Sequence, residues 1–287
     1  MNLEKAWQLT QCLGLETDGE SGATDAQKTV FDWQVPDGWQ QGRGAYGGLV
    51  IATMVQAVLM ATRDPDRTVR SITAELCGPV MVGPARVVVE VLRNGSGMTT
   101  AAVRVVQAEV GKEGVSAPVV QSHAVIILGK RRVEGHAWNE LRPLSVPSWQ
   151  ESQPQDRFVE QIPAFARQFE YRVVGPAPYS RHAEAVAAAW IRPVEAVSRA
   201  DALWVVALSD VVWPSMITRF AVPRPMATIS YMLEIVDDLD GVDPQVPVLH
   251  VGRTPVSQQG YTVEFRELWG ADGRLLALNQ QTIVMIR

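Results

Sequence analysis

A single carboxylate interrupts one of the most apolar stretches of the sequence. The segment LWVVALSDVVWP, residues 203–214, holds Asp210 among aliphatic and aromatic side chains and gives it no cationic neighbour. Desolvating an isolated carboxylate costs several kcal/mol or raises its pKa, and helix dipoles disfavour an acid near a helix end such as the one expected at Pro214. Local stability therefore does not explain Asp210. A general base in a cleft would explain it; the alternative is a carboxylate that reaches solvent or caps the next segment.

Covalent and metal-dependent chemistry find no support in the sequence. Neither Cys12 nor Cys77 lies in a CxxC or CxxH pattern, and no GxSxG elbow is present. The histidines lack the spacing of metal ligands: His123, His136, His182 and His250. We therefore expect no cofactor and no metal, and no side chain that acts as a covalent nucleophile.

A glycine-rich turn, GRGAYGGLV, precedes an apolar segment and is a second candidate for chemistry. It places Gly47 and Gly48 at the expected start of a helix, where free N–H groups and the positive end of the helix dipole can face a carbonyl oxygen. Alternatively, the glycines only let a helix and a sheet approach each other. The turn is not a phosphate-binding GxGxxG loop, because no βαβ unit follows it.

The elements that must position these residues are predicted to occur twice in the same order. Each copy has a strand, a helix that is apolar on all sides and four strands rich in β-branched residues. The helices are expected to begin near Tyr46 and near Ala200, the second running to about Trp213. We expect the two units at residues 1–130 and 166–287, joined by a proline-punctuated linker at 131–165.

The order of the motifs resembles a known family. FDWQVPDGW, GRGAYGGLVIATMVQA, RSITAELCGPVMVGPARVVVEVLRN and the ending GYTVEFRELWGADGRLLALNQQTIVMIR are similar to the tandem-hotdog acyl-CoA thioesterases, the thioesterase II and thioesterase-like superfamily. The resemblance covers most of the chain outside the linker. It implies an α+β double hotdog, in which each of two tandem units wraps an antiparallel sheet round a long buried helix. It also implies hydrolysis of acyl-CoA thioesters to a free acid and CoA.

The resemblance further implies which residues hold the hydrolytic water. In this family an aspartate of the second hotdog helix, a threonine or serine of the following strand and a glutamine of the last strand do so. Asp210 fills the first place as the base, and Thr228 and Gln281 fill the other two and orient the water. The residues expected to contact the substrate are Tyr46, Gly47, Gly48 and Ser230.

Strand periodicity supports two of these assignments independently. In MATISYMLEI the apolar residues alternate, which leaves Thr228 and Ser230 together on the other face. In LLALNQQTIVMI, Gln281 shares a face with apolar residues, where an amide needs partners. Alternatively, Thr228 only forms hydrogen bonds at the edge of a strand, and Gln281 points to solvent. If the two halves are superposed, His123 takes the position of Gln281. His123 would then belong to a second site, or it is a histidine of the sheet whose hydrogen bonds are satisfied.

Two competing functions are weighed against hydrolysis. A hotdog hydratase or dehydratase would need an Asp/His pair, and no histidine lies within a helical turn of Asp210. A hotdog that binds thioesters without hydrolysing them, or that acts on a substrate tethered to a carrier protein, is the other alternative. In a protein that only binds thioesters, three buried polar side chains without a catalytic role would cost free energy.

Composition and charge limit the classes of molecule that the protein is expected to bind. The 287 residues carry a net charge of −5 and a pI near 5.5, with no basic run longer than GKRR, which argues against nucleic acid and anionic membranes. No apolar run is long enough to span a bilayer, and the start MNLEKAWQLTQCLG is unlike a signal peptide. We expect a cytoplasmic enzyme of lipid metabolism that acts on a small molecule and that can form a homo-oligomer.

Overall fold

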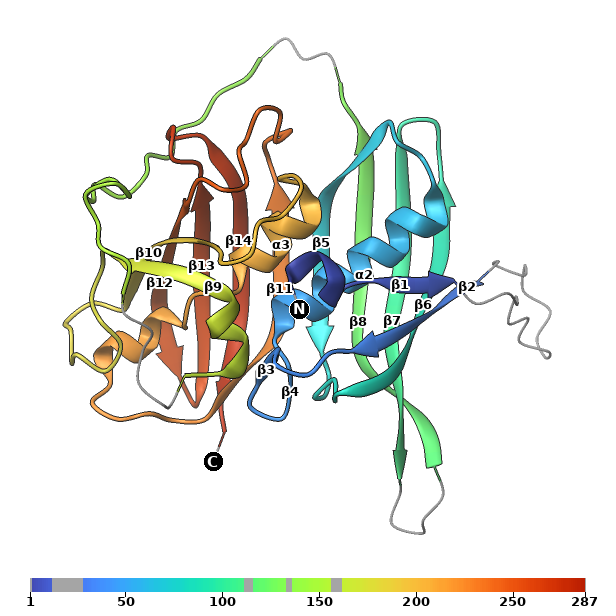
Figure 1. The fold of residues 1–287 in the computed structure, drawn as a ribbon, viewed down its shortest axis with the longest axis horizontal. Helices are drawn as coiled ribbons and strands as arrows, with labels where there is room; N and C mark the ends of the chain where they lie inside the picture. The colour runs from blue at the N-terminus through green and yellow to red at the C-terminus, as the bar shows by residue number, and fades with distance from the viewer. Residues whose placement is uncertain (1, 12–27, 111–115, 133–135, 156–161, 287) are drawn as a thin grey trace.

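One continuous antiparallel sheet of twelve strands dominates the computed structural model (Figure 1). The structure describes residues 2–11, 28–110, 116–132, 136–155 and 162–286. The strand order is β1-β2-β6-β7-β8-β5-β11-β14-β13-β12-β10-β9. The two halves meet where β5 (Arg67–Leu76) pairs with β11 (Met226–Ile235), with Tyr231 opposite Ala74. The sheets of the two halves therefore join edge to edge.

The remaining elements follow the chain in the predicted order. The first half contains α1 (Leu3–Ala6), β1 (Leu9–Gln11), β2 (Lys28–Val35), β3 (Gln40–Gln41), β4 (Gly44–Ala45), α2 (Gly47–Thr62), β6 (Gly83–Asn94), β7 (Met98–Val110) and β8 (Ser116–Lys130). The second half contains η1 (Ala164–Gln168), β9 (Phe169–Val173), β10 (Val186–Pro193), α3 (Ala202–Ser209), η2 (Ser215–Arg219), β12 (Val248–Gln258), β13 (Tyr261–Trp269) and β14 (Leu275–Met285).

The duplication is visible in the sheet topology. The order β2-β6-β7-β8-β5 in the first half corresponds to β10-β12-β13-β14-β11 in the second. In each half the first of these strands precedes the helix and the other four follow it. The repeated unit and the α+β double-hotdog arrangement are thus confirmed, while the domain boundaries at 130 and 166 stay a prediction.

Two buried helices lie against one face of the sheet and against each other (Figure 1). Helix α2 spans 16 residues, and its apolar sequence is buried on nearly every side over its first three turns. Helix α3 spans eight residues and is capped by the Asp201 side chain, which accepts hydrogen bonds from the N–H groups of Leu203 and Trp204. Such a cap stabilises a helix by about 1 kcal/mol. Both helices can be buried because no charged side chain interrupts them.

Helix α3 is shorter than the sequence predicted. It ends at Ser209, and Asp210 is its C-terminal cap, whereas helix was expected to about Trp213. Pro214 has no N–H group and restricts the residue before it, so the helical turn is not continued to the proline. Asp210 therefore lies at the end of the helix and not within it.

The described part of the predicted linker packs against the sheet. Residues 136–155 contain no helix or strand, yet Leu144, Val146 and Trp149 contact a second apolar cluster on the outer face of the second half: Ala188, Trp190, Leu249, Val251 and Trp269. The indole N–H of Trp190 donates to the backbone oxygen of Pro147 at 2.9 Å. This segment therefore covers the sheet face opposite the helices.

Candidate active site

Asp210 lies at the junction of the two halves, where three donors converge on its carboxylate. The Gly48 N–H at the start of α2 donates to Oδ2 at 2.8 Å. The Gln281 amide on β14 and the Arg266 guanidinium on β13 donate to Oδ1 at 2.8 and 3.3 Å. The side chain is only 8% exposed. The alternative of a carboxylate that escapes to solvent is therefore excluded.

Gln281 and Thr228 complete a chain of hydrogen bonds that ends on Asp210. Gln281 is fully buried, and its Oε1 accepts from the Thr228 hydroxyl at 2.9 Å. Its Nε2 donates to Asp210 and also to Asn279 Oδ1, at 3.1 Å. The structure thus brings together the three residues that the sequence proposed for holding the water, and Gln281 does not point to solvent.

Ser230 does not share the face of Thr228, so that prediction was wrong. A register shift separates Thr228, which lies opposite Ile283, from Ser230, which lies opposite Thr282. Ile229 is the extra residue of a β-bulge, and a bulge reverses the alternation of side chains beyond it. Thr228 therefore faces inward, as Tyr231 does, while Ser230 lies on the face away from Asp210. Ser230 is removed from the set of substrate contacts.

The glycine turn allows a close approach between α2 and the acid. An added Cβ at Gly47 would lie 2.9 Å from Oδ2 of Asp210, and one at Gly48 would lie 2.6 Å from the ring of Tyr46. The Gly48 N–H is engaged by Asp210, so the prediction that it faces a substrate oxygen does not hold in this structure. In the described part of the chain the Gly47 N–H has no acceptor. It stays the candidate oxyanion donor.

Tyr46 supports this turn from the core. It is fully buried and stacks on Phe165 with ring centroids 4.5 Å apart. Trp39 also stacks on Tyr46, with ring centroids 6.1 Å apart. Burial and the charge of Asp210 raise the pKa of the Tyr46 hydroxyl well above its usual value, so the residue stays neutral. Its predicted contact with substrate stays a prediction.

We expect Gly48→Ala to destabilise the protein and lower its activity together. The new Cβ would meet the Tyr46 ring at 2.6 Å and the Ala207 oxygen at 3.0 Å, and overpacking of this kind costs about 1–3 kcal/mol. Thermal melting and thiol release would be measured beside Gly95→Ala, whose Cβ meets nothing nearer than 3.5 Å. Equal melting temperatures for the two variants would contradict the close approach.

Two buried charged side chains that the sequence did not predict, Arg266 and Glu264, lie beside Asp210. Arg266 is 2% exposed, and its Nε donates to Glu264 Oε1 at 2.6 Å. The other oxygen of Glu264 accepts from the N–H and hydroxyl of Ser215 and from the Thr254 hydroxyl, at 2.6, 2.8 and 3.1 Å. Asp210 has no cationic partner in its own sequence segment, but the fold brings Arg266 to it from strand β13.

The sequence of β13, YTVEFRELW, contains a pattern that could have indicated the ion pair of Glu264 and Arg266. Glu264 and Arg266 share the inward face, while Phe265 between them is 48% exposed. This reverses the usual arrangement, in which the apolar residues of a half-buried strand face the core. An acid and a base two residues apart in a strand share a face, which could have suggested a buried ion pair.

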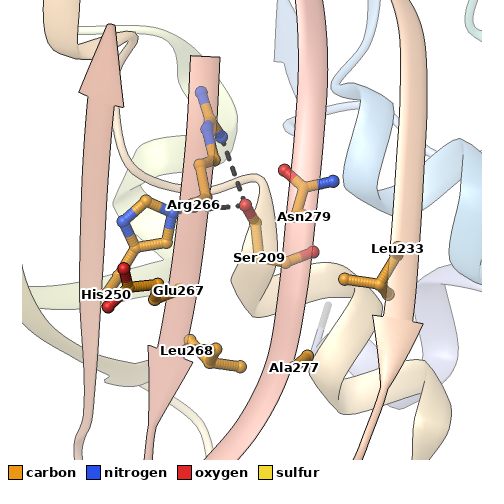
Figure 2. Close-up of a pocket in the computed structure, with 8 residues that line it drawn as sticks. All are labelled: Ser209, Leu233, His250, Arg266, Glu267, Leu268, Ala277 and Asn279. Carbon is orange, nitrogen blue, oxygen red and sulfur yellow. Dashed lines mark hydrogen bonds between the residues drawn. The ribbon is translucent and has the colours of Figure 1, made fainter. Parts of the chain in front are cut away.

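Two further donors fix the backbone beside Asp210. Figure 2 shows His250 and Arg266 converging on the carbonyl oxygen of Ser209, with nitrogen–oxygen distances of 3.3 and 3.2 Å. His250 is fully buried, and burial together with the charge of Arg266 lowers its pKa to about 3. A neutral imidazole that donates through Nε2 therefore holds the end of α3. The other ring nitrogen, Nδ1, has no partner among the described residues.

Opposing effects act on the pKa of the Asp210 carboxyl group. Burial raises the pKa of its carboxyl, and the nearby Glu264 raises it further. Arg266 and the donors from Gln281 and Gly48 lower the pKa, and the net shift is upward. A carboxylate with a raised pKa is a stronger base than one in water, which suits it to take a proton from water near neutral pH.

The remaining predicted features lie outside this cluster. His123 is on the outer face, where its Nδ1 lies 3.2 Å from Glu75 Oε2, so it does not occupy the inward position of Gln281. Among the described residues, no group of His, Cys, Asp and Glu could hold a metal. Cys77 is exposed and free, and Cys12 lies outside the described residues. No helix among the described residues is long and apolar enough to cross a bilayer.

Comparison with known proteins identifies the family. Residues 35–126 match the model of the acyl-CoA thioesterase N-terminal domain, and residues 140–285 match that of the C-terminal domain. No curated relative matches the chain in sequence.

Solved structures share the fold over the whole chain. A conserved protein of unknown function with hot dog fold from Alicyclobacillus acidocaldarius is 21% identical, with a TM-score of 0.81 and coverage of 99% of this chain and 98% of that one. The acyl-CoA thioesterase II TesB2 from Mycobacterium marinum is 17% identical, with a TM-score of 0.71 and the same coverage. The tesB protein of Mycobacterium avium subs paratuberculosis is 14% identical, with a TM-score of 0.72, again at that coverage.

Both family models are matched in order, and together they cover most of the sequence and the Asp210 cluster. The chain therefore belongs to the acyl-CoA thioesterase family and is a thioester hydrolase.

Proposed function

We propose that the enzyme hydrolyses acyl-CoA thioesters to a free acid and CoA with a water activated by Asp210 and oriented by Thr228 and Gln281. The observation that carries the proposal is the hydrogen-bond chain from Thr228 through Gln281 to a buried carboxylate. Thioesters are already activated, so a positioned water, a base and donors for the oxyanion suffice.

Among the described residues, the hydrogen bonds of the cluster leave one acceptor position of Asp210 unused. A carboxylate has about four acceptor positions, and Asp210 uses two on Oδ1 and one on Oδ2. The unused position is on Oδ2, which lies 2.9 Å from where a Cβ added at Gly47 would stand. A water there can donate one hydrogen to Asp210 and the other to an oxygen of Thr228 or Gln281. Its lone pair is then free to attack the thioester carbonyl.

The remaining donor that the mechanism needs is assigned to the first half of the chain. The Gly47 N–H lies at the N-terminus of the 16-residue helix α2, where the helix dipole is positive. A carbonyl oxygen that receives negative charge during attack is stabilised there. The proposed site therefore needs both halves: the base and water-binding groups come from the second and the oxyanion donor from the first.

The competing functions are less compatible with these contacts. A dehydratase would need a histidine that reaches substrate, but His250, which lies behind Ser209, is fully buried. A pure binder would gain nothing from a buried base whose pKa is raised. A cytoplasmic setting in lipid metabolism and pairing of copies through the sheet stay part of the proposal.

The two water-orienting residues should contribute less than the base. Gln281→Ala and Thr228→Val remove hydrogen bonds to the water without removing the proton acceptor, so each should lower kcat by less than a change at Asp210. Because both act on one water, the double variant should lose less than the product of the two single losses. Strictly multiplicative losses in steady-state kinetics would show that the residues have separate roles.

The activity itself is tested by release of free thiol from a panel of acyl-CoAs of increasing chain length. We expect turnover for at least one length, with equal amounts of thiol and free acid. Tight binding of acyl-CoAs without thiol release from any of them would overturn the proposal in favour of a binding protein.

A further inference from the structure

A groove beside η2 carries positive charge that the catalytic cluster does not use. It has a volume of about 520 Å³ and is lined by Ala185, Met216, Arg219, Phe220, Thr254, Pro255, Val256 and Ser257. This volume is in the range of sites for small molecules and cofactors. Arg219 is exposed and Thr254 is half-buried, so the groove is open to solvent and has polar as well as apolar side chains in its lining.

One arginine lines this groove, and two others lie next to Phe220 in its lining. Arg219 lines it, and the guanidinium of Arg224 lies over the ring of Phe220, 5.9 Å from its centroid. The backbone N–H of Arg181 donates to the Phe220 oxygen, which brings a third arginine to the same place. Within the described ranges none of the three makes an ion pair, although the chain as a whole has a net charge of −5. Unpaired guanidinium groups around a groove are suited to phosphates, which they bind bidentately.

The groove is connected to the catalytic carboxylate by buried hydrogen bonds. Thr254 in its lining donates to Glu264. Glu264 also accepts from Arg266, which in turn donates to Asp210. The loop that carries Arg224 also leads into β11, and Arg224 is only four positions before Thr228 in the sequence. Four residues span at most about 14 Å. A ligand with a long arm can therefore hold phosphates in the groove and a thioester at the water.

We propose that this groove binds the phosphate-bearing nucleotide end of CoA. The inference rests on the proposed function and deepens it, because it selects free acyl-CoA over an acyl group presented by a carrier protein. CoA carries a pyrophosphate and a 3′-phosphate at the end of its pantetheine arm. Arg219 and Arg224 contact these phosphates, and Phe220 offers an aromatic face to the adenine.

The experiment compares two substrates that carry the same acyl group, acyl-CoA and the acyl thioester of pantetheine, which lacks the nucleotide. In the double variant with Arg219→Gln and Arg224→Gln we expect KM for acyl-CoA to rise about tenfold or more, since each charged hydrogen bond contributes about that much to affinity. kcat should be unchanged, and kcat/KM for acyl-pantetheine should equal that of the wild type. The matched control is Arg131→Gln, which removes an arginine with 76% of its side chain exposed from outside the groove.

A binding measurement separates this inference from the proposed function. CoA alone is titrated calorimetrically into the wild type, the double variant and the control, which requires no hydrolysis. A loss of affinity of about tenfold or more in the double variant alone supports the groove even if no acyl-CoA is hydrolysed. Equal affinity in all three proteins overturns it, as would equal losses on acyl-CoA and acyl-pantetheine. Hydrolysis of acyl-carrier protein but not of acyl-CoA, lost in the double variant, would overturn the nucleotide assignment in favour of an acidic carrier protein.

Discussion

Asp210→Asn should lower the rate of acyl-CoA hydrolysis by roughly 10²–10⁴-fold, the usual effect of losing a general base. The amide has almost the same shape, and its oxygen can still accept the hydrogen bonds from Arg266 and Gln281, but it loses the bond from Gly48 and cannot take a proton from water. Removing a buried negative charge also leaves Arg266 paired with Glu264. We therefore expect a melting curve close to that of the wild type.

The matched control for this variant is Asp201→Asn at the other end of the same helix. Asp201 caps α3, and asparagine is an equally good capping residue, so this variant should keep both rate and stability. Steady-state thiol release and thermal melting are measured on both proteins. Near-wild-type turnover in Asp210→Asn, with an unchanged melting curve, would remove Asp210 from the mechanism.

Arg266→Met should move the acid limb of the pH profile of kcat/KM to higher pH. Activity requires the Asp210 carboxylate, so it is lost as pH falls through the pKa of that group. Arg266 lowers this pKa, and its removal must raise it. The variant should also be less stable by about 3–5 kcal/mol, because it leaves Glu264 and Asp210 buried without their cation.

Arg266→Lys separates the electrostatic effect from loss of structure. It keeps the positive charge but not the guanidinium fork, so the acid limb should return toward that of the wild type even if kcat stays low. The buried tyrosines Tyr46, Tyr171 and Tyr231 do not account for such a shift, because burial raises their pKa values and they stay neutral at acid pH. An acid limb at the same pH in all three proteins would contradict the assignment of that limb to Asp210.

The features that sequence patterns predicted are those that depend on local periodicity. The two buried helices follow from all-round apolar segments, and the inward face of Gln281 follows from the two-residue repeat of β14, whose alternation is unbroken there. The repeated strand order follows from recurrence of the same pattern. The identity of the site residues came from family resemblance, which periodicity supported only at Thr228 and Gln281.

The features that were missed depend on register and on contacts between distant segments. A bulge at Ile229 turns Ser230 away from the site, and a bulge adds a residue without any change in composition. Arg266 lies 56 residues from Asp210 and reaches it only because Glu264 is opposite Gln281 in the sheet. Likewise, the engagement of the Gly48 N–H follows from the packing of α2 against the end of α3.

The central claim is that a water held by Asp210, Thr228 and Gln281 attacks the thioester directly. It is tested most directly by a single turnover with enzyme in excess over an acyl-CoA, following free thiol and free acid in the same samples. Direct attack predicts one rate constant for both products and no change in the mass of the protein at any time. Thiol release that precedes acid formation, with the mass of the acyl group appearing on the protein, would contradict it.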